Sequence, residues 1–324
     1  MKTTVVIPNY NGIEYLENCI RKLSESAKHR EFAILVVDNG STDGSLRQAE
    51  EFERQGVLEL ISLPCNTGFC GAVNKGIRHC KTDYVLLLNN DTEVTEDFVG
   101  ELEHFMESHP KAFGVSSKML SLKEPDVIDD CGDLYCVLGW AFGLGKGKNA
   151  SYYDKDGEIF APCGGASIYR KKVFDKIGLF DENHFAYLED IDIGYRALIH
   201  GYHNYYCHSA VVYHAGSGFS GSRYNRFKID LSAKNSIYLI FKNMPLLQIL
   251  LNLPFLLAGF CIKAFFFAAK GYGGVYLKGL WKGIVLGLSE EGRKKKVRFR
   301  FKNLPCYIKI QIFLWWNTVR RIIG

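Results

Sequence analysis

Two amides and a carboxylate, Asn89, Asn90 and Asp91, directly follow a short apolar run, Tyr84 to Leu88. An unbroken apolar run of this length is typical of a parallel strand that is covered by helices on both faces. Ligands of open α/β sheets bind beyond the carboxyl ends of the strands, so these polar side chains would lie at the mouth of a ligand crevice. There, Asp91 can hold a divalent cation against a diphosphate. The same residues also fit a turn in which Asp91 caps the segment that follows.

A second group of residues with chemical potential is acidic: Glu189, Asp190 and Asp192, followed by Arg196 and a stop at Gly201. This pattern predicts a helix with its acids in the first turn. Compensation of the helix dipole is a sufficient reason for acids at this position, and a general base is the functional alternative.

A lone histidine, His214, follows the strand-like segment 210–213. Histidine at the end of a strand fits a structural role as well as a metal ligand, and only a carboxylate nearby would distinguish the two. Asp38 and Asn39 similarly follow the apolar segment 32–37, where a carboxylate that reads a ligand would lie.

The elements that must position these residues alternate between strand and helix along the first hundred residues. Strand-like runs at 3–7, 32–37, 58–62 and 84–88 are each followed by a helical pattern. This order predicts an α/β fold with a doubly wound, mostly parallel sheet.

Three stretches of the sequence bear on the ligand. The turn after the first strand, residues 8–12, lacks the G-x-G-x-x-G pattern, which argues against a dinucleotide oxidoreductase. The glycine-bearing stretch 66–76 would bring backbone N–H groups toward phosphates, although small residues there also permit close helix packing. Residues 118–160 show little periodicity, which favours a segment that faces the substrate.

Charge is unevenly distributed along the 324 residues. The net charge of +5 combines about +12 in residues 246–324, which carry fourteen Lys and Arg against two Glu, with about −7 elsewhere. The ten cysteines form no C-x-x-C pair, and Met1–Thr4 leads straight into a strand without a signal peptide, so we expect reduced thiols and a cytosolic location. We divide the chain into a catalytic domain, 1–244, and a C-terminal region, 245–324.

The C-terminal region begins with an apolar run, 246–262, that Gln248, Asn252 and Pro254 interrupt. Such a run favours an interfacial or re-entrant segment over a spanning helix. Cations interleaved with aromatic residues at 293–302 are typical of a surface that binds anionic lipid. A solvated basic tail and a nucleic-acid site are the alternatives, but no nucleic-acid recognition module accompanies the cluster.

Taken together, residues 3–217 resemble family 2 glycosyltransferases, and more specifically the bacterial rhamnosyltransferase-like members that build surface polysaccharides. The motifs are V-V-I-P-N-Y-N, V-V-D-N-G-S-T-D-G-S, N-T-G-F-C-G-A-V-N-K-G, L-L-L-N-N-D-T, F-A-Y-L-E-D-I-D-I-G-Y-R and V-Y-H-A-G-S. In this order and at these spacings the set is highly specific.

The resemblance implies a GT-A fold, a nucleotide-diphospho-sugar donor, a divalent metal (Mg²⁺ or Mn²⁺) and inversion at the anomeric carbon. It implies that the donor is bound by Pro8, Asn9, Tyr10, Asp38, Asn39, Asn74, Asn89 and Asn90, with the Asp38 carboxylate accepting from a pyrimidine N3–H. It makes Asp190 the catalytic base, and Asp91 and His214 the metal ligands. The family's D-x-D motif begins here with Asn89, so one carboxylate is missing, but Mg²⁺ keeps several waters and needs few protein carboxylates.

The sequence therefore predicts an inverting, metal-dependent sugar transferase at the cytoplasmic face of the membrane, peripheral or re-entrant. Its acceptor would be a glycan carried on lipid, and its partner surface an anionic membrane. The sequence does not name the sugar; the resemblance most commonly suggests dTDP-rhamnose as the donor, beside UDP- and GDP-sugars. Two alternatives stay open: a transferase that acts on bare polyprenyl phosphate, and a non-catalytic adaptor that binds membrane or nucleic acid.

Overall fold

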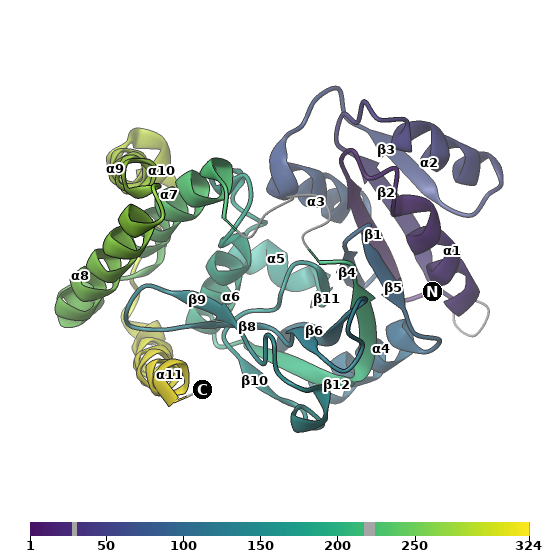
Figure 1. The fold of residues 1–324 in the computed structure, drawn as a ribbon. Coiled ribbons are helices and arrows are strands. Elements are labelled where there is room, and N and C mark those ends of the chain that lie inside the picture. Colours follow the sequence, from purple (N-terminus) through teal and green to yellow (C-terminus); the bar gives the residue numbers. More distant parts are fainter. Residues whose placement is uncertain (28–30, 217–223, 324) are drawn as a thin grey trace.

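A computed structural model describes residues 1–27, 31–216 and 224–323. Ser217 and Gly218, which the sequence places in a turn after His214, lie outside the described residues. One large sheet runs through the molecule with helices on both of its faces, and the C-terminal helices form a separate layer on one flank (Figure 1). This is the α/β architecture that the sequence predicts.

The central sheet has the strand order β10-β12-β6-β11-β4-β1-β2-β3. The four N-terminal strands pair in parallel: β1 (Thr3–Asn9), β2 (Ala33–Asp38), β3 (Glu59–Ser62) and β4 (Tyr84–Leu88). The other half is mixed, because β11 (Ala166–Arg170) runs antiparallel to both β4 and β6 (Ala112–Ser121). Strand β12 (His203–His214) is parallel to β6 and pairs antiparallel with β5 (Thr92–Val94) and β10 (Gly157–Ile159).

Alternation along each strand produces two apolar cores, one on each face of the sheet. In β1, Val5 and Ile7 face α1 (Leu16–Ser26), α2 (Ser45–Arg54) and α4 (Phe98–Ser108). The intervening Val6 faces α3 (Gly68–His79), α5 (Lys171–Ile177) and α6 (Glu189–Ile199). Because both faces are covered, every residue of β4 is buried, which is why this strand is an unbroken apolar run in the sequence.

Residues 118–160 contain more regular structure than their weak periodicity indicates. Besides the end of β6 they form β7 (Ile128–Asp130), β8 (Asp133–Tyr135), β9 (Ala141–Gly143), the 3-10 helix η1 (Ala150–Tyr152) and β10. Each of these elements has three residues, too few for an alternating pattern to be visible. They enclose a small core of their own, and they bring three aspartates toward the strand ends described below.

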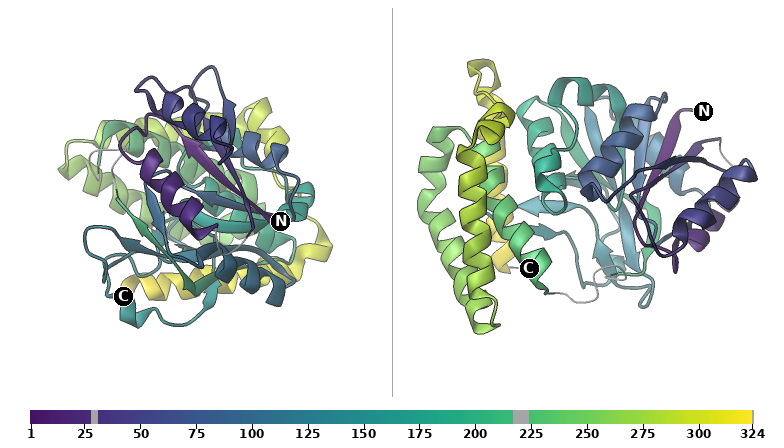
Figure 2. Two further views of the ribbon diagram at one scale, coloured as in Figure 1. Left: turned by 90° about the vertical axis from the view of Figure 1, so that its right-hand side faces the viewer. Right: turned by 90° about the horizontal axis from the view of Figure 1, so that it is seen from above.

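After η2 (Glu182–His184), α6 and β12, the chain is helical: α7 (Arg226–Asn243), α8 (Leu246–Ala269), α9 (Gly273–Leu288), α10 (Glu290–Lys295), η3 (Phe301–Asn303) and α11 (Leu304–Ile323). The two further views place this layer on the side of the molecule away from β3 and α2 (Figure 2). Its helices share a core with the catalytic domain, in which Tyr195 of α6 meets Leu256 of α8 and Leu314 of α11. The division at residue 244 stays a prediction.

The apolar run at 246–262 is continuous helix, although three residues seemed to interrupt it. Helix α8 passes through Pro254 and continues to Ala269. Among the described residues it is the helix whose length and composition would allow it to cross a membrane.

Candidate active site

The ends of β1, β2 and β4 bring three of the predicted donor-binding residues into contact. The Asn9 Nδ2 group donates to Asp38 Oδ1 at 2.8 Å and to Ser45 Oγ at 2.9 Å, and Asn90 Nδ2 donates to Asn9 Oδ1 at 2.7 Å. Asn9 and Asp38 are completely buried. The turn that follows β1 needs glycine, because a Cβ on Gly12 would lie 2.0 Å from Asn90 Nδ2. The predicted Pro8 and Tyr10 flank Asn9 and are partly exposed.

Asn39 connects the end of β2 to the glycine-bearing loop. Its Nδ2 donates to Gly68 O at 3.1 Å, and its Oδ1 accepts from Thr67 N at 2.9 Å. Gly68 is left-handed, and a Cβ there would lie 2.6 Å from the carbonyl oxygen of Phe185. The loop therefore packs tightly against the segment that precedes α6, and this close packing explains the glycine at position 68.

Two of the predicted residues, Asn74 and Asn89, have structural contacts. The Asn74 side chain is buried on α3 and bonds both the N–H and the carbonyl of Phe180, at 3.0 and 2.8 Å, and Glu182 at 2.9 Å. Its amide thus holds the turn at 180–182, and contact with a nucleotide stays a prediction. Asn89 is fixed through its backbone N–H, which donates to Gly165 O at 2.8 Å.

The two predicted metal ligands meet beyond the ends of β4 and β12. Asp91 Oδ1 lies 3.2 Å from His214 Nε2, with only 11% and 15% of the two side chains exposed. On the other side of the ring, His214 Nδ1 donates to Asp129 Oδ2 at 2.6 Å, and Lys146 Nζ contacts Asp129 at 2.8 Å. His214 therefore has carboxylates beside it, as the metal-ligand interpretation of this histidine requires.

This cluster has the donor types that a divalent cation requires. A carboxylate oxygen and an imidazole nitrogen are both ligands for Mn²⁺, and they face one another here. Asp129 fixes the ring through the opposite nitrogen, which is the usual outer-shell support of a histidine ligand. The residues present therefore fit a metal ion, which Asp91 and His214 could hold.

The same contacts determine the protonation of the cluster. Burial alone would lower the pKa of His214, but its bonds to Asp129 and Asp91 raise that pKa to about 9. Burial alone would raise the pKa of Asp129, but the bonds from His214 and Lys146 hold it well below its usual range. A cation bound at His214 Nε2 would displace the proton from that nitrogen.

Asp190, the predicted base, lies in the first turn of α6 as expected. Its Oδ1 accepts from the N–H of Ile191 at 2.7 Å. The carboxyl group of Asp133 is a neighbour of Asp190. Burial and the neighbouring Asp190 raise the pKa of Asp133 well above its usual range.

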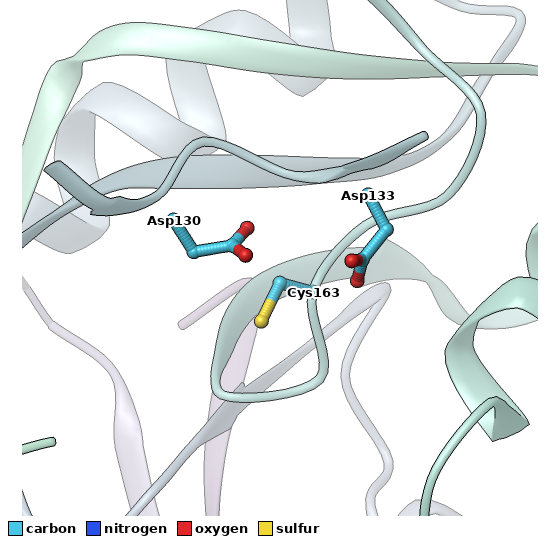
Figure 3. A group of neighbouring side chains, drawn as sticks. All are labelled: Asp130, Asp133 and Cys163. Carbon is cyan, nitrogen blue, oxygen red and sulfur yellow. The ribbon is translucent and has the colours of Figure 1, made fainter. Parts of the chain in front are cut away.

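Asp133 belongs to a partly buried cluster with Asp130 and Cys163, whose side chains converge from β7, β8 and the loop before β11 (Figure 3). The nearest ligand atoms of the three lie within 4.8 Å of one another. Burial raises the pKa of Asp130 to about 7, and it also raises the pKa of Asp190.

The loop that leads into α6 is conformationally unusual. Phe185, Tyr187 and Leu188 are non-glycine residues with φ between 64° and 69°. Such conformations cost free energy and persist only where the surroundings enforce them. Here Asn235 of α7 supplies the restraint: its buried Nδ2 donates to the carbonyls of His184, Ala186 and Tyr187 at 2.9, 2.9 and 2.8 Å.

A buried ionic network anchors the same region to α7. Asp192 is fully buried and bonds Arg196 at 2.7 Å, Lys242 at 2.8 Å and Asn243 at 2.8 Å. Lys242 also bonds Asp181 at 2.7 Å. Burial alone would raise the pKa of Asp192, but Arg196 and Lys242 hold it far below its usual range. Asp192 is thus a structural carboxylate, and it does more than compensate a helix dipole.

Several solved structures share this fold. A Staphylococcus aureus TarS fragment, residues 1–349 in complex with UDP-GlcNAc, aligns with a TM-score of 0.56 at 17% identity, over 97% of this chain and 89% of that chain. The mannosyltransferase PcManGT from Pyrobaculum calidifontis, in complex with GDP-Man and Mn²⁺, aligns with a TM-score of 0.52 at 17% identity, over 97% and 84%. The chain therefore has the GT-A fold that these two proteins share.

Curated relatives agree with this class. The Mycobacterium tuberculosis (strain H37Rv) N-acetylglucosaminyl-diphospho-decaprenol L-rhamnosyltransferase is 27% identical over 233 residues, 65% of this chain and 75% of that protein. The Bacillus subtilis (strain 168) protein named uncharacterized glycosyltransferase YfnE is 24% identical over 249 residues, 60% of each chain. The family model described as Glycosyl transferase family 2 matches residues 4–178, so the chain belongs to that family.

Proposed function

We propose that this enzyme transfers a sugar, with inversion, from a nucleotide-diphospho-sugar to a hydroxyl group of a lipid-linked glycan. The observation that carries the proposal is the segment 129–133: Asp129 hydrogen-bonds His214, and Asp133 is a neighbour of Asp190. This segment links the proposed metal ligand to the proposed base.

In this mechanism Asp190 takes the proton of the acceptor hydroxyl as that oxygen attacks the anomeric carbon. The bond between the anomeric carbon and the diphosphate oxygen breaks, and the nucleoside diphosphate leaves with the bonding electrons. A divalent ion held by Asp91 and His214 would neutralise charge on the diphosphate. The raised pKa of Asp190, caused by burial, makes its carboxylate a stronger acceptor for the hydroxyl proton than an ordinary aspartate.

Two further parts of the proposal concern the substrates. The printed name of the M. tuberculosis relative supports rhamnose as the sugar and a diphospho-polyprenol glycan as the acceptor. The TarS and PcManGT complexes support a nucleotide-sugar donor, and the PcManGT complex also supports Mn²⁺ as the metal.

A thermal-shift panel of dTDP-, UDP- and GDP-sugars, each with and without Mn²⁺, tests the donor. A ligand that binds only the folded protein at a hundred times its Kd adds about 2.7 kcal/mol to the unfolding free energy, which is easily detected as a rise in Tm. We expect one nucleotide class to raise Tm, and to do so only with Mn²⁺. If neither the nucleotide sugars nor the free nucleoside diphosphates raise Tm, the proposal is wrong. Transfer to bare polyprenyl phosphate would favour the alternative acceptor.

A further inference from the structure

Helix α8 buries its polar face against the protein and exposes its apolar faces, whereas an amphipathic helix of a soluble protein does the opposite. Its buried residues are Gln248, Asn252, Leu256 and Gly259, which recur every three or four positions and so share one face. The remaining faces expose large apolar side chains, including Leu247 at 78% and Phe265 at 77%. The residues that seemed to interrupt the apolar run are thus the ones that attach the helix to the protein.

The attachment is a closed set of hydrogen bonds. Asn252 and Gln311 of α11 exchange two bonds, both of 2.8 Å, and Gln248 Nε2 donates to Gln311 Oε1 at 3.1 Å. Tyr195 OH of α6 donates to Gln248 Oε1 at 2.8 Å. All four side chains are buried. Satisfied polar networks of this kind fix a single arrangement, here of α8 and α11 on α6.

The middle of α8 also lies directly on the catalytic domain. A Cβ on Gly259 would lie 2.1 Å from the carbonyl oxygen of Leu138, and Trp140 Nε1 donates to Gly259 O at 3.1 Å. Contact therefore extends from Gln248 to Gly259, roughly 16 Å of helix at about 1.5 Å per residue. A helix that spans a membrane must pass through roughly 30 Å of hydrocarbon. The catalytic domain covers one side of α8 over about half of that length, so this part of the helix cannot be surrounded by lipid.

Helices α9 and α11 extend the apolar surface. Helix α9 exposes Trp281 at 65% and Val285 at 52%, and α11 exposes Ile312 at 58% and Trp316 at 54%. Across the described residues, 24 of the 29 exposed large apolar side chains lie at 246–323. These helices form one flank of the molecule in Figure 1 and in the right-hand view of Figure 2.

Helix α9 packs closely against α7. Gly279 and Gly283 bring its backbone against α7, since a Cβ at either would lie 2.7 and 2.4 Å from the carbonyl oxygens of Asp230 and Lys234. The same α7 carries Asn235, which restrains the loop before Asp190.

The charge of the segment indicates what covers the surface. Residues 246–324 carry fourteen Lys and Arg against two Glu. Cations beside a broad exposed apolar face are complementary to an anionic lipid surface, which offers hydrocarbon and negative headgroups together.

We propose that α8, α9 and α11 form a surface that docks on an anionic lipid bilayer, with α8 lying in the membrane plane instead of crossing the bilayer. This deepens the proposed function, since it brings the enzyme to a lipid-linked acceptor. Helix α6 contacts the docking helices at Tyr195 and begins at Glu189, so Asp190 lies about 7 Å along the helix from that contact.

Cysteine labelling in sealed vesicles tests the orientation. Lys270 is exposed and follows the last residue of α8. In the double variant Cys261→Ser/Lys270→Cys, which also removes the exposed cysteine of α8, the thiol at residue 270 shows on which side of the bilayer that end of the helix lies. Protein is added from outside to sealed vesicles that contain phosphatidylglycerol, and a membrane-impermeant maleimide follows. We expect residue 270 to react at once, like the exposed Cys65 of the catalytic domain. Reaction of residue 270 only after detergent would mean that α8 crosses the bilayer, which overturns the proposal.

Vesicle co-sedimentation tests the partner without any donor or turnover, so its outcome is independent of the proposed reaction. We expect binding to phosphatidylglycerol vesicles that falls with salt, and much weaker binding to phosphatidylcholine vesicles. Leu247→Glu/Trp281→Glu should lose this binding and keep its Tm with nucleotide sugar, because both side chains are exposed. Equal binding to both vesicle types, binding to neither, or unchanged binding of the double variant would each overturn the proposal.

Discussion

Removal of the Asn235 amide should slow sugar transfer through a residue that touches neither reactant. Asn235→Ala takes away the Nδ2 group that holds the carbonyls of His184, Ala186 and Tyr187 at 2.8 to 2.9 Å. Without it, the left-handed residues before α6 lose a restraint and the loop can relax to ordinary backbone conformations. Asp190, which follows this loop, would then be misplaced in part of the population.

The magnitude follows from the hydrogen bonds. The amide has two N–H groups, each worth about 0.5–1.5 kcal/mol net, so the native loop should be destabilised by about 1–3 kcal/mol. A factor of ten corresponds to about 1.4 kcal/mol, which gives a loss of roughly tenfold to a hundredfold in kcat. The KM for the donor should change little, because Asn9 and Asp38 are fixed by other strands.

Steady-state kinetics with a detergent-solubilised acceptor, together with urea unfolding, measure the two effects. Asn317→Ala is the matched control: Asn317 is also fully buried and also donates its Nδ2 to a backbone carbonyl, that of Tyr135 at 3.0 Å, but lies on α11. We expect a loss of stability in both variants, smaller in Asn317→Ala because it removes one bond, and a loss of kcat in Asn235→Ala alone. Equal kcat in both would refute a positioning role for Asn235.

Three other perturbations have defined outcomes. In calorimetry, Asp91→Ala should abolish Mn²⁺-dependent donor binding and His214→Ala should weaken it; unchanged affinity in Asp91→Ala would contradict the metal assignment. Asp192→Asn should lower the unfolding free energy by about 3–5 kcal/mol in urea unfolding, because buried Arg196 loses its carboxylate partner and buried Lys242 loses one of its two; a loss under 1 kcal/mol would contradict the structural role. Burial lowers the pKa of His184 to about 4, so below pH 6.5 the unfolded chain binds a proton that the folded chain binds only near pH 4. As the pH falls from 6.5 to 4, the unfolding free energy should therefore decrease by up to about 3 kcal/mol, and His184→Phe should remove that decrease. The same dependence of stability on pH in parent and variant would contradict this role of His184.

The parts of the fold and site that have a clear apolar or charge pattern could be predicted from the sequence. Strand β4 and the first turn of α6 lie where periodicity places them, and Asp91 meets His214 because both follow strands of one sheet. Asp129 and Asp133 could not be predicted, since they belong to or follow three-residue strands that have no visible period.

The clamp at Asn235 escaped prediction for a different reason. It lies some fifty residues after the carbonyls that it binds, and no local pattern indicates such a contact. Gln248 and Asn252 were taken as interruptions of an apolar run, although their spacing of four residues places them on one helical face.

The central claim is that Asp190 is the base of a sugar transfer, and Asp190→Asn tests it most directly. The variant keeps the shape of the side chain, and its amide still accepts from Ile191, so it should fold and bind donor and metal as the parent does. A positioned base is worth on the order of a hundredfold to ten-thousandfold, so the rate of transfer should fall at least a hundredfold. Per folded molecule, Asp192→Asn should lose much less. Near-normal transfer by Asp190→Asn, or equally large losses in the two variants, would contradict the assignment.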